Sequence, residues 1–427
     1  MKIKSLHLKD FRGIAELSLD LDDKMTVLAG VNGVGKTAII EAIALVLRHL
    51  VQPESKEPVE YAPGKFGTEV PTTRTFDVRE GRSQARVDAT IELLGRTTTC
   101  GVTLERVEPD TPPGVATVEL DRSLLDAQAV FAKLLEQSEL VPLFAIGYYR
   151  DERTIEALNP ARTQEEPFRL QRRQAYAEAF DGYSEFLKWL LARESYENEI
   201  IRDDPQARDG QLEAVRQAIG QGMPHLKNLR VRRTAQKITV TKDRVDLDVA
   251  ELAPGEKTVM LLFADIARRL AMAALTPLNR LEAEGIILID ELELHLHPAW
   301  QRMVPEKLPQ VFPNVQFVVT THSPQVLSAI EPGKVVVLQR APDGTMTVER
   351  PTTFGRTSDL ILEAVLGVPE RKSDVKDLLH ELYVALDDDR LDEAKKLRAD
   401  LERRLGPGEP ELGRIDVLIR RAEARRA

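Results

Sequence analysis

The sequence of 427 residues is poor in cysteine, in long apolar runs and in positive charge. Cys100 is the single cysteine, which excludes a disulfide framework and a zinc site built on several thiolates. No apolar run approaches the roughly 18 residues that a membrane-spanning helix needs, and the N-terminus lacks the apolar segment of a signal peptide. We therefore expect a soluble protein of the reducing cytoplasm that has no membrane partner.

The charge balance is acidic. Lys and Arg together number 59 and Asp and Glu number 69, which gives a formal net charge of −10. This balance excludes a basic protein that coats nucleic acid over its whole surface, although a local stripe of basic residues is still compatible with it. With 42% hydrophobic and 30% charged residues the chain has the composition of a globular protein. Its length predicts two or three folding units.

A glycine-rich segment at residues 30–37 carries the most specific pattern of the sequence. It matches G-x-x-x-x-G-K-[ST] at every fixed position, between a buried strand at 25–29 and a helix. Its backbone N–H groups can surround phosphate oxygens, Lys36 can reach the β- and γ-phosphates, and the Thr37 hydroxyl can bind Mg²⁺. The residues expected to bind the nucleotide here are Asn32, Gly33, Val34, Gly35, Lys36 and Thr37.

Polar side chains follow two further buried runs. Asp290 and Glu291 end one of them, and Thr321 and His322 follow the next. An aspartate at a strand end can hold Mg²⁺, and an adjacent glutamate can orient and deprotonate an attacking water. His322 can touch the γ-phosphate or that water, whereas the alternative is a capping turn in which it is merely hydrogen-bonded. We expect Asp290, Glu291, Thr321 and His322 to complete the nucleotide site.

These motifs, in this order, resemble the ABC-type ATPase heads of the RecF/SMC superfamily. The match begins at the turn of residues 11–13 and continues through the phosphate loop (Walker A) and Asp290-Glu291 (Walker B) to His322. Residues 293–298 are similar to the D-loop of these heads. The resemblance implies an α/β fold with two lobes, a mixed or parallel sheet and an antiparallel β lobe. It also implies ATP and Mg²⁺ as ligands, with catalytic roles for Lys36, Glu291 and His322.

Residues 252–257 are similar to the signature motif of these heads, usually written LSGGQ or LSSGE. In that family the signature motif of one head closes over the nucleotide of a second head, so the resemblance implies a homodimer or higher homo-oligomer around ATP. A plain helix cap is the alternative. Ala253 replaces the family's serine, and we therefore expect slow hydrolysis. The signature residues expected at the nucleotide are Ala253, Pro254, Gly255 and Glu256.

The chain divides into four predicted parts. These are an N-terminal ATPase lobe at 1–150, a helical insert at 151–224, a C-terminal ATPase lobe at 225–353 and a helical extension at 354–427. In the first lobe we expect an antiparallel sheet from 2–29 and 85–107, with a long surface loop over 51–83. In the third part we expect strands at 226–233 and 236–249 and a helix at 256–275. No glutamine lies at the family's Q-loop position, so that role is unassigned.

Several weaker patterns leave alternatives open. The basic residues Arg230, Arg232, Arg233 and Lys237 form either a track for DNA phosphates or an ordinary solvated surface. His295 and His297 with Glu293 fit a metal site, although the D-loop is the better supported interpretation. The acidic run at 387–389 fits either a two-metal nuclease or, more simply, a solvated helix end.

The short helical extension separates this chain from nuclease-bearing relatives. OLD-type relatives carry a TOPRIM nuclease after the ATPase core, and residues 354–427 are too few and too helical for one. The chain looks like the PtuA ATPases of Septu and retron-associated anti-phage systems, which implies a separately encoded HNH-nuclease partner, PtuB, and a DNA-directed activity. The alternatives are a RecF-like DNA-repair ATPase and a scaffold that binds nucleotide with little or no hydrolysis.

Overall fold

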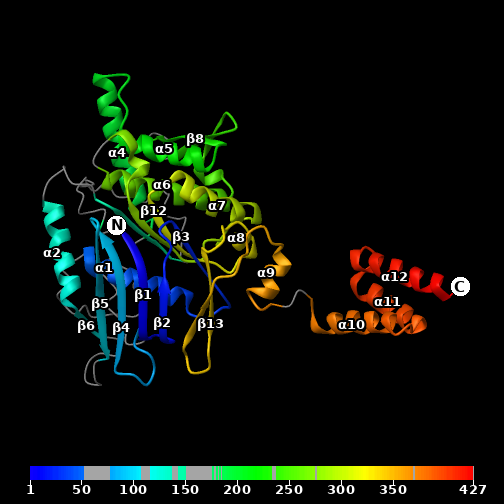
Figure 1. Cartoon of the computed structure of the whole chain (residues 1–427). Coiled ribbons are helices and arrows are strands. Elements are labelled where there is room, and N and C mark those ends of the chain that lie inside the picture. Colours follow the sequence, from blue (N-terminus) through cyan, green and yellow to red (C-terminus); the bar gives the residue numbers. More distant parts are fainter. Residues whose placement is uncertain are drawn as a thin grey trace. The chain divides into compact units, whose positions relative to one another are not determined.

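The computed structural model describes the chain in several stretches (Figure 1). They are residues 1–51, 77–106, 116–136, 143–150, 176, 179–180, 182–183, 185–232, 237–274, 277–368 and 371–426. The chain forms two compact units, Met1–Ile361 and Leu362–Ala427. Most of the predicted loop at 51–83, the first part of the predicted insert, and Arg233 lie outside the described residues. None of the described helices combines the length and apolar character that crossing a bilayer requires.

A mixed sheet of six strands forms the centre of the first unit. Its order is β14-β13-β3-β12-β11-β7, and all neighbours are parallel except β13 and β14. Every residue of β3, β7 and β11 is buried, as expected for strands covered on both faces. The bounds are β3 Met25–Ala29, β7 Ala145–Tyr149, β11 Gly285–Ile289, β12 Val315–Thr320, β13 Val335–Arg340 and β14 Met346–Glu349.

A second, antiparallel sheet has the order β2-β1-β4-β5-β6. The prediction of an antiparallel lobe is confirmed. The strand predicted at residues 25–29 does not belong to it, however, because these residues pair in the mixed sheet. The fully buried side chains of β3 fit a strand with two covered faces, whereas β2 buries alternate residues. The bounds are β1 Lys2–Phe11, β2 Ile14–Asp20, β4 Gln84–Leu93, β5 Arg96–Arg106 and β6 Ala116–Leu120.

Helix α1 (Lys36–Val51) links the two sheets, because it contacts β1, β4 and β5 on one side and β11 and β12 on the other. Helix α2 (Arg122–Glu136) packs against α1 and β5, and neither α2 nor β6 was predicted. Helix α2 buries few apolar residues, among them Leu124 and Phe131, so its pattern is weak. Helix α6 (Pro254–Ala273) is almost entirely buried and contacts β7.

Of the remaining elements of the first unit, α5 and α7 contact α6 (Figure 1). A three-stranded antiparallel sheet has the order β10-β9-β8. The single strand predicted at 236–249 was wrong: Asp243 and Arg244 have φ values of 49° and 72° and form a turn that divides it. The bounds are α4 Phe186–Asp203, α5 Gly210–Gly222, β8 Leu226–Arg232, β9 Lys237–Lys242, β10 Val245–Asp248, α7 Pro298–Val311 and α8 Pro324–Ser328.

Helices α10, α11 and α12 form the second unit, and α9 (Ser358–Ala364) precedes them. The described part of this unit contains no strand, as predicted for the extension. Its core consists of Val375, Leu382, Leu401, Leu412, Ile415 and Ile419. The acidic run at 387–389 joins α10 to α11, and Asp388 pairs with Arg390 at 2.9 Å. The bounds are α10 Ser373–Asp387, α11 Leu391–Leu405 and α12 Pro410–Arg426.

Candidate nucleotide site

The glycine-rich loop connects the end of β3 to the start of α1, as the sequence predicts. Gly30, Gly33 and Gly35 have φ values of 145°, 76° and 113°, in the region that favours glycine. At Gly30 an added Cβ would lie 2.8 Å from the carbonyl oxygen of Leu338 on β13, so the loop passes too close to that strand for any side chain. The loop conformation therefore depends on glycine at this position.

The Lys36 amine is buried in this loop without a charged hydrogen-bond partner. Its Nζ donates to the carbonyl oxygens of Gly30 at 2.9 Å and Val31 at 3.0 Å. Burial lowers the pKa of Lys36 to about 8, although the nearby carboxylates of Glu293, Asp290 and Glu291 act in the opposite direction. A phosphate group at the loop would supply the counter-charge that the two carbonyl oxygens do not.

The carboxyl ends of β11 and β12 meet beside this loop. Asp290 is buried, and its backbone N–H donates to the carbonyl oxygen of Tyr149 on β7 at 2.8 Å. The Thr320 hydroxyl donates to Asp290 Oδ1 and accepts from the N–H of Glu291 at 2.8 Å. Glu291 has a φ of 48°, and its side chain is 38% exposed. Asp290 is thus fixed and Glu291 accessible, and their roles as metal ligand and base stay predictions.

His322 lies beside this carboxylate. Its Nε2 is 3.9 Å from Glu291 Oε1, and its backbone N–H donates to Glu293 Oε1. Thr321, also predicted to contact the nucleotide, is buried: its N–H donates to the Leu28 carbonyl, and its hydroxyl accepts from the Ser323 N–H at 3.0 Å. The structure thus brings His322 to Glu291 and uses Thr321 to shape the turn.

Two oxygen donors fit a magnesium ion. Thr37 is an exposed residue in the otherwise buried first turn of α1, and Asp290 follows β11 directly. Mg²⁺ prefers hard oxygen ligands and usually takes only one or two from the protein, the rest coming from water and phosphates. A threonine hydroxyl and a carboxylate therefore suit this metal, and no larger protein cage is required.

The segment similar to the signature motif begins α6. Ala253 precedes the first helical residue, Pro254, and the Ala253 N–H donates to Glu256 Oε2 at 3.3 Å. Lys242 of β9 contacts the same carboxylate at 2.8 and 3.0 Å, and His225 Nε2 lies 3.2 Å from it. Burial alone would raise the pKa of Glu256, but Lys242, the Ala253 N–H and His225 together lower it. Glu256 therefore anchors the helix start to β9.

Gly255 of this segment packs against the predicted D-loop. A Cβ at Gly255 would lie 3.1 Å from the His295 carbonyl oxygen. His297 caps α7, because its Nδ1 accepts from the Ala299 N–H at 3.3 Å. Across the part of the chain that the structure describes, no group of three or more His, Cys, Asp or Glu residues could hold a metal ion. The structure gives the metal interpretation of His295 and His297 no support.

The predicted basic track is largely neutralised by neighbouring acids. Arg232 pairs with Asp246 at 3.2 Å and Lys237 with Asp248 at 3.4 Å. Arg230 lies 3.9 Å from Glu197. All three basic side chains remain substantially exposed, at 43% to 59%. A DNA-binding role for this surface stays a prediction, and its positive charge is weaker than the sequence suggests.

Tyr148 belongs to the site but was not predicted as a functional residue. It is buried on β7, and its hydroxyl has no hydrogen-bond partner among the described residues. Burial and the carboxylate of Glu41 raise its pKa, which also responds to Arg150 and Asp290 nearby. The Arg150 guanidinium lies 5.2 Å from the Tyr148 ring centre. The apolar run at 141–149 signals a buried strand, but nothing in it marks a tyrosine that faces the Walker B aspartate.

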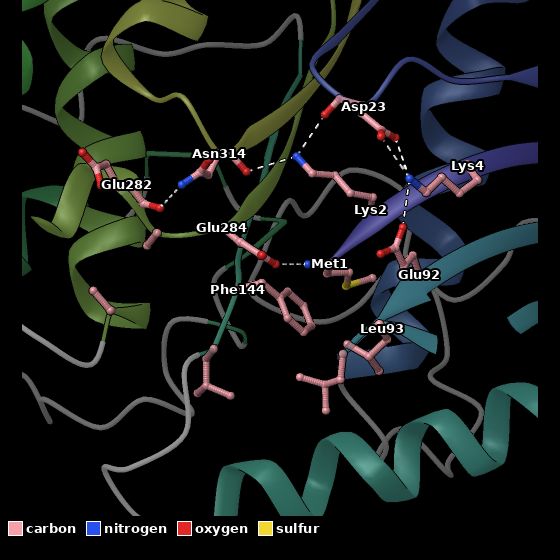
Figure 2. Close-up of a pocket in the computed structure, with 15 residues that line it drawn as sticks. Met1, Lys2, Lys4, Asp23, Glu92, Leu93, Phe144, Glu282, Glu284 and Asn314 are labelled. Carbon is pink, nitrogen blue, oxygen red and sulfur yellow. Dashed lines mark hydrogen bonds and ion pairs between the residues drawn. The ribbon is translucent and has the colours of Figure 1, made fainter. Parts of the chain in front are cut away.

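A second cleft, of about 740 Å³, lies at the opposite edge of the mixed sheet (Figure 2). Asp23, Phe144, Glu284 and Asn314, which line it, precede β3, β7, β11 and β12. The N-terminal ammonium contacts Glu284, and Lys4 contacts Asp23 and Glu92 at 2.8 and 2.9 Å. Lys2 instead donates to the carbonyl oxygens of Asp23 at 2.9 Å and Asn314 at 3.1 Å. This cleft is remote from the phosphate loop.

Two family models match the chain. One, described as "AAA ATPase domain", covers residues 1–82, and the other, "AAA domain, putative AbiEii toxin, Type IV TA system", covers 120–328. The chain is 27% identical to the "Retron Ec83 probable ATPase" of Escherichia coli, over 98% of this chain and 86% of that protein. It is 30% identical to the "Septu protein PtuA" of Bacillus mycoides, but this match covers only 34% of this chain and 20% of PtuA.

The fold has a solved counterpart. The structure titled "Crystal structure of the SmcHead bound to the C-winged helix domain of ScpA" superposes with a TM-score of 0.50 and covers 82% of this chain and 98% of that one. At 14% identity this likeness concerns the fold alone. It confirms the predicted class, an α/β ATPase head. The family models and the relatives, with this fold, support an ABC-type ATPase head related to the retron ATPases and to PtuA.

Proposed function

We propose that this chain binds ATP with Mg²⁺, hydrolyses it slowly, and serves as the ATPase subunit of an anti-phage defence complex. One observation carries the enzymatic part. Lys36, Asp290, Glu291 and His322, distant in sequence, meet beside the glycine-rich loop. This set contains a cation for the phosphates, a metal ligand, a base and a polar contact for the γ-phosphate.

Each side chain has a distinct task in hydrolysis. Lys36 would exchange its two carbonyl contacts for the β- and γ-phosphates. Glu291, accessible at the strand end, would accept a proton from the attacking water, and His322 at 3.9 Å would orient that water or the γ-phosphate. Thr37 and Asp290 would hold Mg²⁺, which offsets the negative charge of the phosphates.

The start of α6 supports a dimer around ATP. A helix N-terminus carries partial positive charge and unpaired N–H groups, which suit a γ-phosphate. In this chain Glu256, Lys242 and the D-loop backbone hold that terminus in place. We expect the residues at 253–256 of one copy to face the glycine-rich loop of a second copy.

Turnover measurements on purified protein test the enzymatic proposal. The Glu291→Gln variant should bind ATP as the wild type does but hydrolyse it at least about a hundredfold more slowly, because the base is lost. Glu331→Gln is the control, since Glu331 is an exposed residue paired with Lys334. ATP should also double the mass of Glu291→Gln measured by light scattering. Equal turnover in all three proteins would contradict the role of Glu291.

The nuclease partner requires a separate test. The proposed partner is an HNH nuclease encoded by another gene, whose DNA cleavage the ATPase controls. Purification of the tagged chain from its native cells should recover this nuclease, and cleavage by the complex should respond to ATP. DNA cleavage by the isolated chain would contradict this part of the proposal. Junction-selective DNA binding without a nuclease would favour the RecF-like alternative.

Ala253 favours a second candidate, a scaffold that uses nucleotide only to hold its oligomer. The hydroxyl that the family places there is missing. If this loss explains slow hydrolysis, Ala253→Ser should raise the turnover rate several-fold without changing ATP affinity. If neither the wild type nor Ala253→Ser hydrolyses ATP, yet both dimerise with it, the scaffold is the correct function.

A further inference from the structure

A cleft of about 800 Å³ lies where the β1–β2 turn approaches the end of β13. Four arginines line it, Arg12, Arg79, Arg106 and Arg340, together with one acidic residue, Glu80. The remaining lining residues are a glycine and a valine, so none is aromatic. This arginine cleft concentrates positive charge in a chain whose formal net charge is −10.

Two of the arginines belong to the framework of the cleft. Arg12 contacts Glu41 of α1, and its Nε donates to Asp77 Oδ1 at 2.8 Å. Arg79 lies 3.6 Å from Asp10 and donates to the Asp343 carbonyl at 2.6 Å. Their charges are therefore balanced by carboxylates.

The other two arginines, Arg106 and Arg340, lie exposed at the rim. Within the described ranges no carboxylate forms an ion pair with either of them. Arg106 is nevertheless oriented, because its Nη2 donates to the Val78 carbonyl at 3.0 Å. The Arg340 guanidinium packs over Gly13, where an added Cβ would lie only 3.1 Å from Nη1. The cleft thus holds two oriented guanidinium groups for which the described residues provide no ion-paired carboxylate.

The chemistry of these groups selects the ligand. A guanidinium matches the geometry of a phosphate group and binds it through paired hydrogen bonds. The absence of aromatic lining argues against base stacking, so contact would be with the backbone and independent of sequence. The cleft of Figure 2 differs, since Lys4 there pairs with the carboxylates of Asp23 and Glu92. We propose that the arginine cleft binds the phosphate backbone of a nucleic acid through Arg106 and Arg340.

This assignment deepens the DNA-directed part of the proposed function and rests on it. Binding is measured by fluorescence anisotropy with labelled single-stranded and duplex DNA of about 20 nucleotides, a length that exceeds one binding site. The R106E/R340E double variant should bind at least about tenfold more weakly, and R106A should reduce the salt dependence of binding by about one ion.

R96E is the matched control, because Arg96 begins the strand that Arg106 ends and is also exposed. It should bind DNA as the wild type does, and all variants should keep the thermal midpoint of the wild type. An equal loss in R96E, or no DNA binding by the wild type, overturns the proposal. Inorganic phosphate that binds the wild type as tightly as the oligonucleotide does overturns the nucleic-acid assignment.

ATP binding and turnover, measured on the same preparations, separate this proposal from the previous one. R106E/R340E should leave ATP affinity unchanged. A fall in that affinity would place the cleft within the nucleotide site and overturn the proposal. A wild type that hydrolyses ATP but binds no DNA contradicts the cleft alone, whereas DNA binding through the cleft without ATP turnover contradicts the ATPase alone.

Discussion

Two buried polar groups of the first unit have opposite surroundings: the Asp265 carboxylate, which Tyr149 of β7 contacts, and the Lys36 amine of the glycine-rich loop. Because side chains alternate along a strand, Tyr148 and Tyr149 lie on opposite faces of the sheet, and Tyr149 contacts α6. The Tyr149 hydroxyl donates to Asp265 Oδ2 at 2.7 Å, and Arg268 and Arg269 each donate to the same carboxylate at 2.7 Å. Burial alone would raise the pKa of Asp265, but the two arginines hold it below its ordinary value.

The Lys36 amine lacks this mutual pairing, and so does the Tyr148 hydroxyl on the other face of the sheet. The Tyr148 hydroxyl has no partner among the described residues, and Lys36 donates only to carbonyl oxygens. Here burial dominates and lowers the pKa of Lys36 to about 8. The paired Asp265 cluster stabilises the fold, whereas the buried Lys36 amine, held only by carbonyl oxygens among the described residues, costs stability and can accept an anion.

Asp265→Asn tests the paired cluster and should have the largest effect. It leaves Arg268 and Arg269 buried with no carboxylate between them. We expect the free energy of unfolding to fall by about 3–5 kcal/mol. Chemical denaturation followed by circular dichroism measures it. Asp243→Asn, in an exposed turn, is the control and should change stability by less than about 0.5 kcal/mol.

Lys36→Ala tests the buried amine and should affect ATP binding but not stability. Loss of the cation should weaken ATP binding by at least about a hundredfold, measured by calorimetry with Mg²⁺ present. Because the amine is buried without a paired carboxylate, its removal should leave the thermal midpoint unchanged or slightly higher. A large loss of stability would show that Lys36 is structural, and the contrast with Asp265 would fail.

His49 shows a third behaviour, that of a half-buried histidine that stays neutral. Burial and the neighbouring Arg48 lower its pKa from 6.5 to about 4. Below pH 6.5 His49 is protonated in the unfolded chain but still neutral in the folded chain. The free energy of unfolding therefore falls as the pH falls from 6.5 toward 4. Between pH 6.5 and 5 we expect a loss of about 1–2 kcal/mol. His49→Gln should remove this part of the pH dependence, and identical pH profiles would contradict it.

The two tyrosines themselves provide the finest comparison. Tyr149→Phe removes a hydroxyl that donates to Asp265 and should cost about 1–2 kcal/mol of stability. Tyr148→Phe removes a hydroxyl without a described partner and should be neutral within about 0.5 kcal/mol. Thermal unfolding of both variants, side by side with the wild type, measures the difference. Equal losses would mean that the Tyr148 hydroxyl is satisfied in solution.

The sequence predicted those functional features that depend on residues close together in the chain. The glycine-rich loop, the buried strands before it and before Asp290, and the polar residues at their ends all lie within short segments. Parallel strands bring their carboxyl ends to one edge, so the meeting of Lys36, Glu291 and His322 also follows from these segments. The weak patterns of β6 and α2 were missed because few of their side chains enter the core.

The sequence did not predict which charged side chains form ion pairs. Arg230, Arg232 and Lys237 look like a basic track in the chain, but acids from α4 and β10 neutralise much of it. No sequence pattern marks Arg106 and Arg340 as a pair, yet the fold places them in one cleft. An arginine's role depends on which carboxylates lie within ion-pair distance, and these come from distant segments.

By itself, then, the sequence determined the phosphate-binding chemistry, the strands that present it and the helical extension, since these rest on local spacing and apolar pattern. Only the tertiary structure decided that β3 leaves the antiparallel sheet, that Lys242 secures Glu256, and that Tyr149 completes a buried cluster with Asp265, 116 residues away. Those outcomes depend on long-range packing, which decides whether a buried charge finds its partner.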